Sequence, residues 1–264
     1  MTAEANATQT VHAAAATGYS GAAQAYVSGR PGYPPEAADW LTQVIGLGPD
    51  KRVLDLGAGT GKFEPVLQQT GATILALEPV DAMRIELARL YPDVEALSGN
   101  AQAIPLPDAS LDAVVCAQAF HWFATPAALA EIHRVLKPGG VLGLIWNGRD
   151  ESVSWVAALS EIIDTFEGDA PRFKSGAWRS VFPAPGFEQL DERLARNDHV
   201  GSAEQVLIQR TLSVSFIAAL PADQQKTVET EVRRLIAATP DLADRSEIAF
   251  PYATAMFAFR RTSL

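Results

Sequence analysis

The segment Val53-Leu-Asp-Leu-Gly-Ala-Gly-Thr-Gly-Lys-Phe63 decides the fold of this chain. It begins within the short apolar run 52–56, which is typical of a buried strand, and its glycines at 57, 59 and 61 lead into a helix expected over 61–70. Glycine permits a tight turn and leaves room for a ligand against the backbone, while the free N–H groups of a helix start face that ligand. The segment therefore predicts a ligand site between a strand and a helix.

The alternation of strands and helices continues to about residue 149. Further strands are expected over 73–77, 94–97, 111–117 and 141–146, with helices over 37–45, 81–90 and 125–136. This spacing is typical of βαβ units and predicts a parallel sheet covered on both faces. Beyond residue 149 the rhythm is lost. There we expect a helix over 155–166, a strand over 187–194, two or three helices within 202–243 and a last edge strand over 248–260.

Composition and charge exclude several classes of protein. Of 264 residues 48 % are hydrophobic, which is enough for a packed core, and the net charge of -10 disfavours nucleic acid and membrane surfaces as partners. The single cysteine excludes an intrachain disulfide, and the four histidines have no metal-ligand spacing, so no metal is expected. No signal peptide or 18-residue apolar span is recognisable, which predicts a cytoplasmic protein.

Three interpretations of the glycine loop compete. A phosphate-binding P-loop fails, because Leu56 stands where its first glycine belongs and Phe63 replaces the hydroxyl residue that would hold magnesium. A dinucleotide fingerprint fits badly because Lys62 takes its last small position, although Glu78 follows at the distance of a ribose-binding acid. The pattern GxGxG preceded by Asp55 matches in full.

Four blocks together carry a family resemblance. The loop is followed by LEPVDAM at 77–83, GNAQAIPLPDASLDAVVCAQAFHWF at 99–123 and LKPGGVLGLIWN at 136–147. In this order they resemble class I S-adenosylmethionine (SAM)-dependent methyltransferases. The resemblance implies SAM as cofactor and an α/β, Rossmann-like, doubly wound sheet of seven strands. In that fold the sixth strand is parallel and the last antiparallel.

Composition and resemblance together predict a domain layout. Residues 1–17 are small and polar without an apolar period, which predicts a flexible tail, and the resemblance makes 18–150 the SAM-binding core with an N-terminal helical lid. Residues 151–264 would supply the remaining strands of the same sheet and a helical substrate cap at about 202–243.

The resemblance assigns a set of cofactor residues. Gly57, Gly59 and Gly61 would cradle the methionine part of SAM together with Asp55, and Glu78 would accept hydrogen bonds from both ribose hydroxyls, because a carboxylate offers two oxygens to two adjacent donors. The adenine would lie near Met83, Asn100 and Ala101, although many relatives carry Asp where this chain has Asn100. The remaining predicted cofactor contacts are Arg30, Tyr26 and Gln118.

A looser likeness narrows the family. The stretch with Tyr26, Arg30, Pro31, Tyr33 and Pro34, then QAFHWF at 118–123 and PYAT at 251–254, is similar to small-molecule methyltransferases of the trans-aconitate type, which act on carboxyl groups. His121 follows the fourth strand at the carboxyl edge of the sheet, which predicts a catalytic role as substrate contact or general base, although a packing role is an equal alternative. The predicted substrate contacts are Tyr33, Trp122, Trp146 and Arg149.

The resulting hypothesis is methyl transfer to a small organic molecule at a hydroxyl or carboxylate oxygen, by in-line displacement. Alignment and exclusion of water carry such a reaction, and a base is needed only where the acceptor must lose a proton. Alternatives are a protein or tRNA methyltransferase, a nicotinamide-dependent oxidoreductase, which the glycine spacing disfavours, and a SAM-binding protein without activity.

Overall fold

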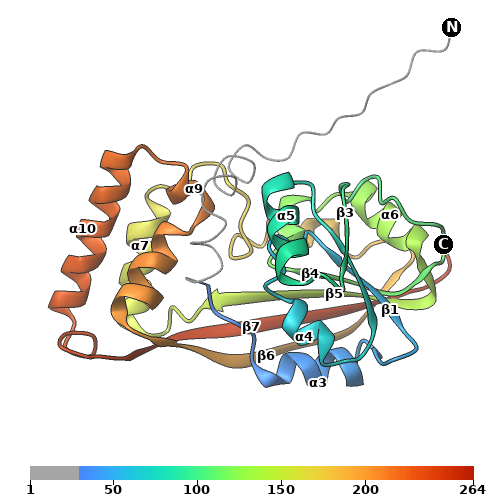
Figure 1. The fold of residues 1–264 in the computed structure, drawn as a ribbon, viewed down its shortest axis with the longest axis horizontal. Helices are drawn as coiled ribbons and strands as arrows, with labels where there is room; N and C mark the ends of the chain where they lie inside the picture. The colour runs from blue at the N-terminus through green and yellow to red at the C-terminus, as the bar shows by residue number, and fades with distance from the viewer. Residues whose placement is uncertain (1–29) are drawn as a thin grey trace, which may run out of the picture.

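Seven strands form one sheet in residues 30–264, the part of the chain that this computed structural model describes (Figure 1). Their order across the sheet is β3-β2-β1-β4-β5-β7-β6. Their bounds are β1 Arg52–Leu56, β2 Thr73–Leu77, β3 Glu95–Leu97, β4 Leu111–Ala117, β5 Leu136–Arg149, β6 Phe187–Gly201 and β7 Ile248–Arg261.

The directions of the strands confirm the predicted topology. The pairs formed among β1 to β5 are all parallel, whereas β7 runs antiparallel to both of its neighbours, β5 and β6. It follows that β6 is parallel to the first five strands and that β7 alone is reversed. The carboxyl ends of β1, β2, β4 and β5 therefore open at one edge, where ligands bind in sheets of this kind.

Helices cover both faces of the sheet because side chains alternate along each strand. Val53 packs with Trp40 of α3 in the core between one face of the sheet and the helices α3 and α4. The adjacent Leu54 packs with Ile132 of α6 in the core on the other face. The helices of this part of the molecule are α3 Pro35–Gln43, α4 Glu64–Gln68, α5 Asp81–Leu90 and α6 Pro126–Val135, with the short turns η1 Phe120–Trp122 and η2 Ala177–Val181.

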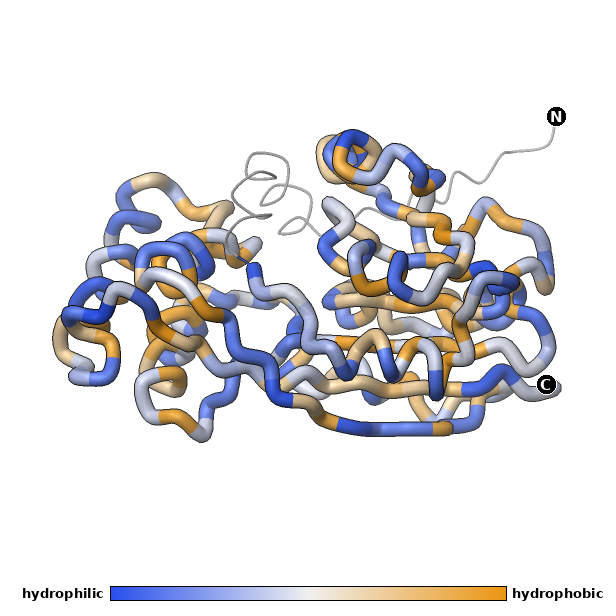
Figure 2. The backbone as a smooth tube through the Cα atoms, turned by 60° about the horizontal axis from the view of Figure 1, so that its bottom comes forward, coloured by the Kyte–Doolittle hydropathy of each residue, from blue (hydrophilic) through white to orange (hydrophobic). Residues whose placement is uncertain are grey.

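A second group of helices lies beyond the far ends of the long strands β5, β6 and β7 (Figure 1). It contains α7 Ser154–Asp164, the π-helical turn η3 Glu204–Gln209, α8 Arg210–Leu212, α9 Ser215–Ala218 and α10 Ala222–Ala238. This group has a core of its own, which joins Leu159 of α7, Val232 of α10 and Phe250 of β7. In Figure 2 hydrophobic segments accordingly occur in both lobes of the molecule.

Two expected helix and strand boundaries differ from the structure. The helix expected over 61–70 is confined to α4, because Gly61 has a φ of +82° and the chain turns through residues 59–63 before it becomes helical. Strand β5 begins at Leu136, which pairs with Leu111, and residues 137–140 form an irregularity before regular pairing resumes at Val141.

The expectation of an edge strand over 248–260 is wrong. Strand β7 lies between β5 and β6, and Met256 and Phe257 are buried on its opposite faces. The edge strand is β6, which continues to Gly201 instead of ending at residue 194 and carries the exposed Leu194 and Val200. The alternation along 248–260 is weak because an interior strand is buried on both sides.

No helix among residues 30–264 is long and apolar enough to cross a membrane.

Candidate active site

The glycine loop lies between β1 and α4, and its backbone adopts angles that favour glycine. Gly57 and Gly59 have φ values of +77° and +59°, which L side chains rarely adopt. A Cβ on Gly57 would lie 2.7 Å from Cβ of Ala119, which stands after β4. The loop backbone is fixed to the next strand, since the amide of Gly57 donates to the carbonyl of Leu77 at 2.8 Å. This loop, residues 57–61, is therefore held in place as a cradle, and a methyl group at position 57 would displace it.

Glu78 closes β2 opposite this loop. Its two carboxylate oxygens accept from the amides of Gly59 at 2.9 Å and Val80 at 2.8 Å. Burial raises the pKa of Glu78, while the two backbone hydrogen bonds and Arg84 oppose that shift. Each oxygen keeps a second lone pair, so the carboxylate can hold the loop and still accept from a ligand diol.

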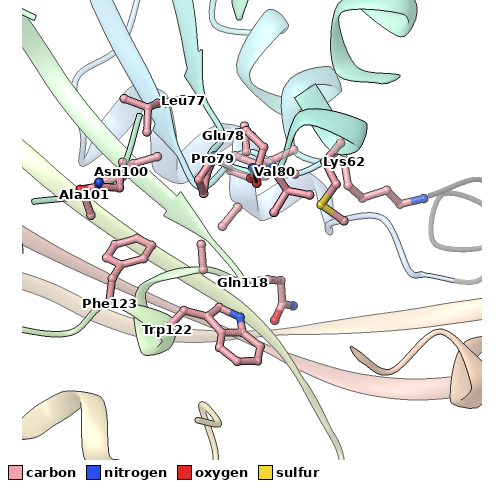
Figure 3. A pocket seen from close by; sticks show the side chains of 18 of the residues that line it. Lys62, Leu77, Glu78, Pro79, Val80, Asn100, Ala101, Gln118, Trp122 and Phe123 are labelled. Atoms are coloured by element: carbon pink, nitrogen blue, oxygen red, sulfur yellow. Dashed lines mark hydrogen bonds between the residues drawn. The ribbon is translucent and has the colours of Figure 1, made fainter. Parts of the chain in front are cut away.

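The loop and Glu78 belong to the wall of a cavity of about 510 Å³. Figure 3 shows Glu78, Asn100 and Ala101 on one side of it and Gln118 and Trp122 on the other. Oδ1 of Asn100 accepts from the amide of Gln102 at 2.9 Å, so its side chain is held in place. Of the predicted cofactor and substrate residues, this cavity brings together Arg30, Tyr33, Gly57, Gly59, Glu78, Met83, Asn100, Ala101, Gln118 and Trp122.

Two acids are buried below the loop. Neither carboxylate of Asp55 or Glu64 has a hydrogen-bond partner among the described residues. Burial raises the pKa of Asp55 well above its ordinary value, with Glu64 and Glu78 adding to the shift, and burial raises the pKa of Glu64 to about 7. Asp55 and Gly61, both predicted to contact the cofactor, do not line the cavity; Gly61 packs against Tyr91, whose ring a Cβ would meet at 2.7 Å.

A second cavity of about 240 Å³ adjoins the first. The residues that line both cavities are Arg30, Gln118, Trp122, Asn147 and Arg210. Gln118 has a φ of +58°, and its backbone N–H donates to the carbonyl of Ile145 at 2.9 Å. A non-glycine residue in this conformation is strained, and such strain concentrates at functional sites.

His121 lines the second cavity, and its ring is fixed from behind by Trp146. The indole N–H of Trp146 donates to Nδ1 of His121 at 3.0 Å. Burial, with the positive charges of Arg172 and Arg30, lowers the pKa of His121 to about 3. At neutral pH the imidazole is therefore uncharged, and because Nδ1 accepts a hydrogen bond, its proton lies on Nε2.

Trp146 itself lines neither cavity. It is fully buried and stacks on Phe173 with 4.8 Å between ring centroids. The structure thus separates Trp146 from the other predicted substrate contacts, whereas Arg149 does reach the second cavity. Tyr26 lies outside the described residues.

Several residues of the site escaped the sequence prediction. Asn147 connects three segments through its side chain. Its side-chain N–H donates to the carbonyl of Gly32 at 2.9 Å, and its Oδ1 accepts from Thr254 at 2.6 Å and from Asn197 at 3.1 Å. Arg172, Lys174 and Arg210 line the second cavity from segments where the sequence has no regular pattern. No local motif marked these three, because folding alone assembles them.

Comparisons with known proteins identify the family. Residues 54–144 match the family model described as a methyltransferase domain. An uncharacterized methyltransferase of Mycobacterium tuberculosis is 40% identical over 236 residues, which cover 89% of this chain and 92% of that protein. An uncharacterized methyltransferase-like protein of Schizosaccharomyces pombe is 38% identical over 235 residues, covering 88% and 91% respectively.

Solved structures share the fold at lower identity. A type II methyltransferase candidate from Anaeromyxobacter dehalogenans has a TM-score of 0.62 and 23% identity and covers 88% of this chain and 97% of that one. The [4+2]-cyclase SpnF has a TM-score of 0.52 and 20% identity, with 87% and 82% covered. The same architecture thus occurs with a different named chemistry, so the family rests on the sequence relatives.

This chain belongs to the class I SAM-dependent methyltransferases. SAM is its cofactor, and the alternative of a nicotinamide-dependent oxidoreductase is excluded. The first cavity fits that cofactor, because a Cβ at Gly57 would clash with Ala119 in its glycine loop and the buried carboxylate of Glu78 stands opposite that loop.

Proposed function

We propose that this enzyme transfers the methyl group of SAM to an oxygen of a small organic molecule, a hydroxyl or a carboxylate. The observation that carries the proposal is the wall shared by the two cavities, where Gln118, Trp122 and Asn147 separate a cofactor-sized space from a smaller one. A donor on one side of such a wall and an acceptor on the other are placed for in-line displacement.

The residues of the first cavity would hold the cofactor. The backbone of Gly57 and Gly59 would lie against its methionine part, Glu78 would accept from the ribose hydroxyls, and Asn100 with Ala101 would meet the adenine. SAM supplies an electrophilic methyl carbon on a positively charged sulfur. The protein then has to align the acceptor and keep out water.

His121 would act as a hydrogen-bond donor toward the acceptor. A base that works near neutral pH needs a pKa close to that pH, whereas the pKa of His121 is about 3. With Nδ1 engaged by Trp146, the N–H at Nε2 is the group available for donation. A neutral donor suits an acceptor oxygen that is already deprotonated, which favours a carboxylate over a hydroxyl.

A tRNA or protein acceptor is the alternative that the family leaves open. The net charge of -10 opposes a polyanion such as RNA. A cavity of about 240 Å³ is small for anything but a compact molecule or a single side chain. The size of the second cavity therefore favours a small molecule.

The deciding experiment is incubation of the full chain with methyl-labelled SAM and a cell extract separated into small molecules, protein and RNA. We expect label in the small-molecule fraction, in a product that alkali hydrolyses if it is a methyl ester. The matched control is Glu78→Ala, which should reduce labelling of every fraction about 30-fold at limiting SAM. Label confined to protein or RNA would contradict the proposal.

A further inference from the structure

The second cavity is lined by cations in a protein of net charge -10. Its lining includes five cationic side chains: Arg30, Arg149, Arg172, Lys174 and Arg210. Among the described residues the acid in this lining is Glu151, which is exposed. The cations come from four separate parts of the chain, namely the segment before α3, the end of β5, the loop after α7 and the start of α8. The fold therefore concentrates positive charge at one place.

The acids packed behind this lining neutralise part of the charge. Asp164 lies 3.5 Å from Arg149 and 4.0 Å from Arg172 and also contacts Lys174, and Glu167 lies 3.1 Å from Arg172. With Glu151 these make three acids against five cations. Within residues 30–264 the cavity thus keeps an excess of positive charge, and Arg172 and Arg30 add to the effect of burial in lowering the pKa of His121.

Two of these arginines are held in conditions that are costly for a cation. The side chain of Arg149 is only 8% exposed, and it shares Asp164 with two other cations. Arg210 donates from Nε to the hydroxyl of Tyr252 at 3.2 Å, but its Nη1 is buried without a hydrogen-bond partner among the described residues. Buried guanidinium groups need anionic partners, and the part of the chain that the structure describes supplies too few.

We infer that the second cavity binds an anionic group of the methyl acceptor, a carboxylate or phosphate, at a point remote from the oxygen that is methylated. Arg149, Arg172 and Lys174 line the second cavity but not the first, so an anion held by them lies on the side away from the cofactor. Arg30 and Arg210 stand at the shared wall. Arg149, Arg172 and Lys174 are thus residues that determine substrate specificity, and the acceptor is an organic acid or a phosphate ester.

This inference rests on the proposed function, and its test uses binding as readout. The full chain is first saturated with S-adenosylhomocysteine and then titrated by calorimetry with succinate, with inorganic phosphate and with the neutral succinamide. We expect succinate or phosphate to bind and succinamide not to bind. Preference for succinate assigns a carboxylate acceptor, and preference for phosphate assigns a phosphate ester.

Variants locate the bound anion. Arg172→Met and Lys174→Met should each weaken anion binding about tenfold or more, because a charge-assisted hydrogen bond is lost, and leave affinity for S-adenosylhomocysteine within about twofold. Arg172→Lys keeps the charge and should retain most of the affinity. The matched control is Arg234→Met on α10, where the arginine is 68% exposed and pairs with Glu231; it should change neither affinity. Lys174 is 37% exposed, so its variant tests the inference even if Arg172→Met unfolds.

Three results would overturn the inference while leaving the proposed function intact. The first is equal binding of succinamide and succinate to the loaded enzyme. The second is absence of binding by both anions at millimolar concentration, and the third is anion binding that the Lys174 and Arg172 variants leave unchanged. Failure of S-adenosylhomocysteine itself to bind would instead contradict the cofactor assignment, so the two failures are distinguishable.

Discussion

The two cavities of this enzyme differ in what their walls are made of. The first is shaped by backbone, with Gly57 and Gly59 presenting amides and with the acids Asp55, Glu64 and Glu78 buried in or below its wall. The second is shaped by long side chains, five of them arginine or lysine. One space thus has an acidic floor and the adjoining one a cationic lining.

This contrast matches the charges of the two reactants. A sulfonium donor is positive at the sulfur and would lie in the cavity of Glu78, an acid whose pKa burial raises, whereas the proposed acceptor is an anion and would meet the cations of the second cavity. Transfer of the methyl group cancels both charges, which in a water-poor site favours the reaction. The comparison teaches that the wall of Gln118, Trp122 and Asn147 separates two electrostatic environments as well as two spaces.

The largest effect is expected at Gly57 in the backbone-built cavity. Gly57→Ala places a methyl group 2.7 Å from Cβ of Ala119, and the resulting displacement with the strain of a positive φ should cost about 4 kcal/mol. We expect affinity for S-adenosylhomocysteine to fall at least a hundredfold in calorimetry.

Gly139 offers the matched control for this change. It has a similar φ of +76°, but a Cβ at this position would meet nothing within 4 Å, so Gly139→Ala introduces the backbone strain without the clash. Cofactor affinity should be preserved in that variant. If both alanine variants bind S-adenosylhomocysteine equally well, the cradle is not where the cofactor lies.

The next effect concerns the acids below the cradle. Burial raises the pKa of Glu64 to about 7 from an ordinary value of 4.5, so the folded state disfavours its ionised form. This group stabilises the fold fully below pH 4.5, and that contribution is lost as pH rises toward 7, by about 3 kcal/mol. Glu64→Gln, which cannot ionise, should match the wild type in acid and exceed it in stability above pH 7.

Chemical denaturation across this pH range measures the difference. The control is Glu36→Gln on α3, where the side chain is exposed. The free energies of unfolding of this variant and of the wild type should change with pH in the same way. If the free energies of unfolding of wild type and Glu64→Gln differ by the same amount from pH 4 to 8, burial does not shift the pKa of Glu64.

A smaller effect is expected where Glu78 meets the loop. Glu78→Ala removes the acceptor for the amides of Gly59 and Val80 and the predicted acceptor for the ribose. We expect affinity for S-adenosylhomocysteine to fall about 30-fold, or about 2 kcal/mol. Glu95→Ala, at an exposed position on the neighbouring β3, should leave it unchanged. Equal affinity in the two variants would place the ribose elsewhere.

The two cavities also differ in how much of them the sequence predicts. The first is encoded locally, because a glycine loop must follow its strand directly and an acid such as Glu78 must end the next one. The parallel direction of the first five strands followed from the βαβ spacing, and the directions of the last two followed from the family resemblance. Ten predicted residues therefore meet in the first cavity.

The second cavity is built from positions that no short pattern connects. Arg172 and Lys174 in the loop after α7 and Arg210 at the start of α8 come from two separate segments and reach one space only after these segments have packed. Trp146 is a prediction that failed for a different reason. Its position at the end of β5 suggested a substrate contact, but the aromatic rings around Phe173 bury it behind His121. Proximity to a strand end fixes the edge of the sheet but not the direction of a side chain.

The smallest effect is expected for the hydrogen bond from Trp146 to His121. Trp146→Phe keeps an aromatic ring in the stack but removes the indole N–H, so Nδ1 no longer fixes the proton on Nε2. We expect kcat to fall about tenfold with KM for SAM unchanged. Trp178→Phe is the matched control, because Trp178 belongs to the same aromatic cluster while its indole nitrogen has no hydrogen-bond partner among the described residues, so activity should persist.

Because the pKa of His121 is about 3, wild-type kcat/KM should stay level between pH 6 and 8; a loss of activity as pH falls through 6.5 would mean that His121 acts as a base instead of a donor.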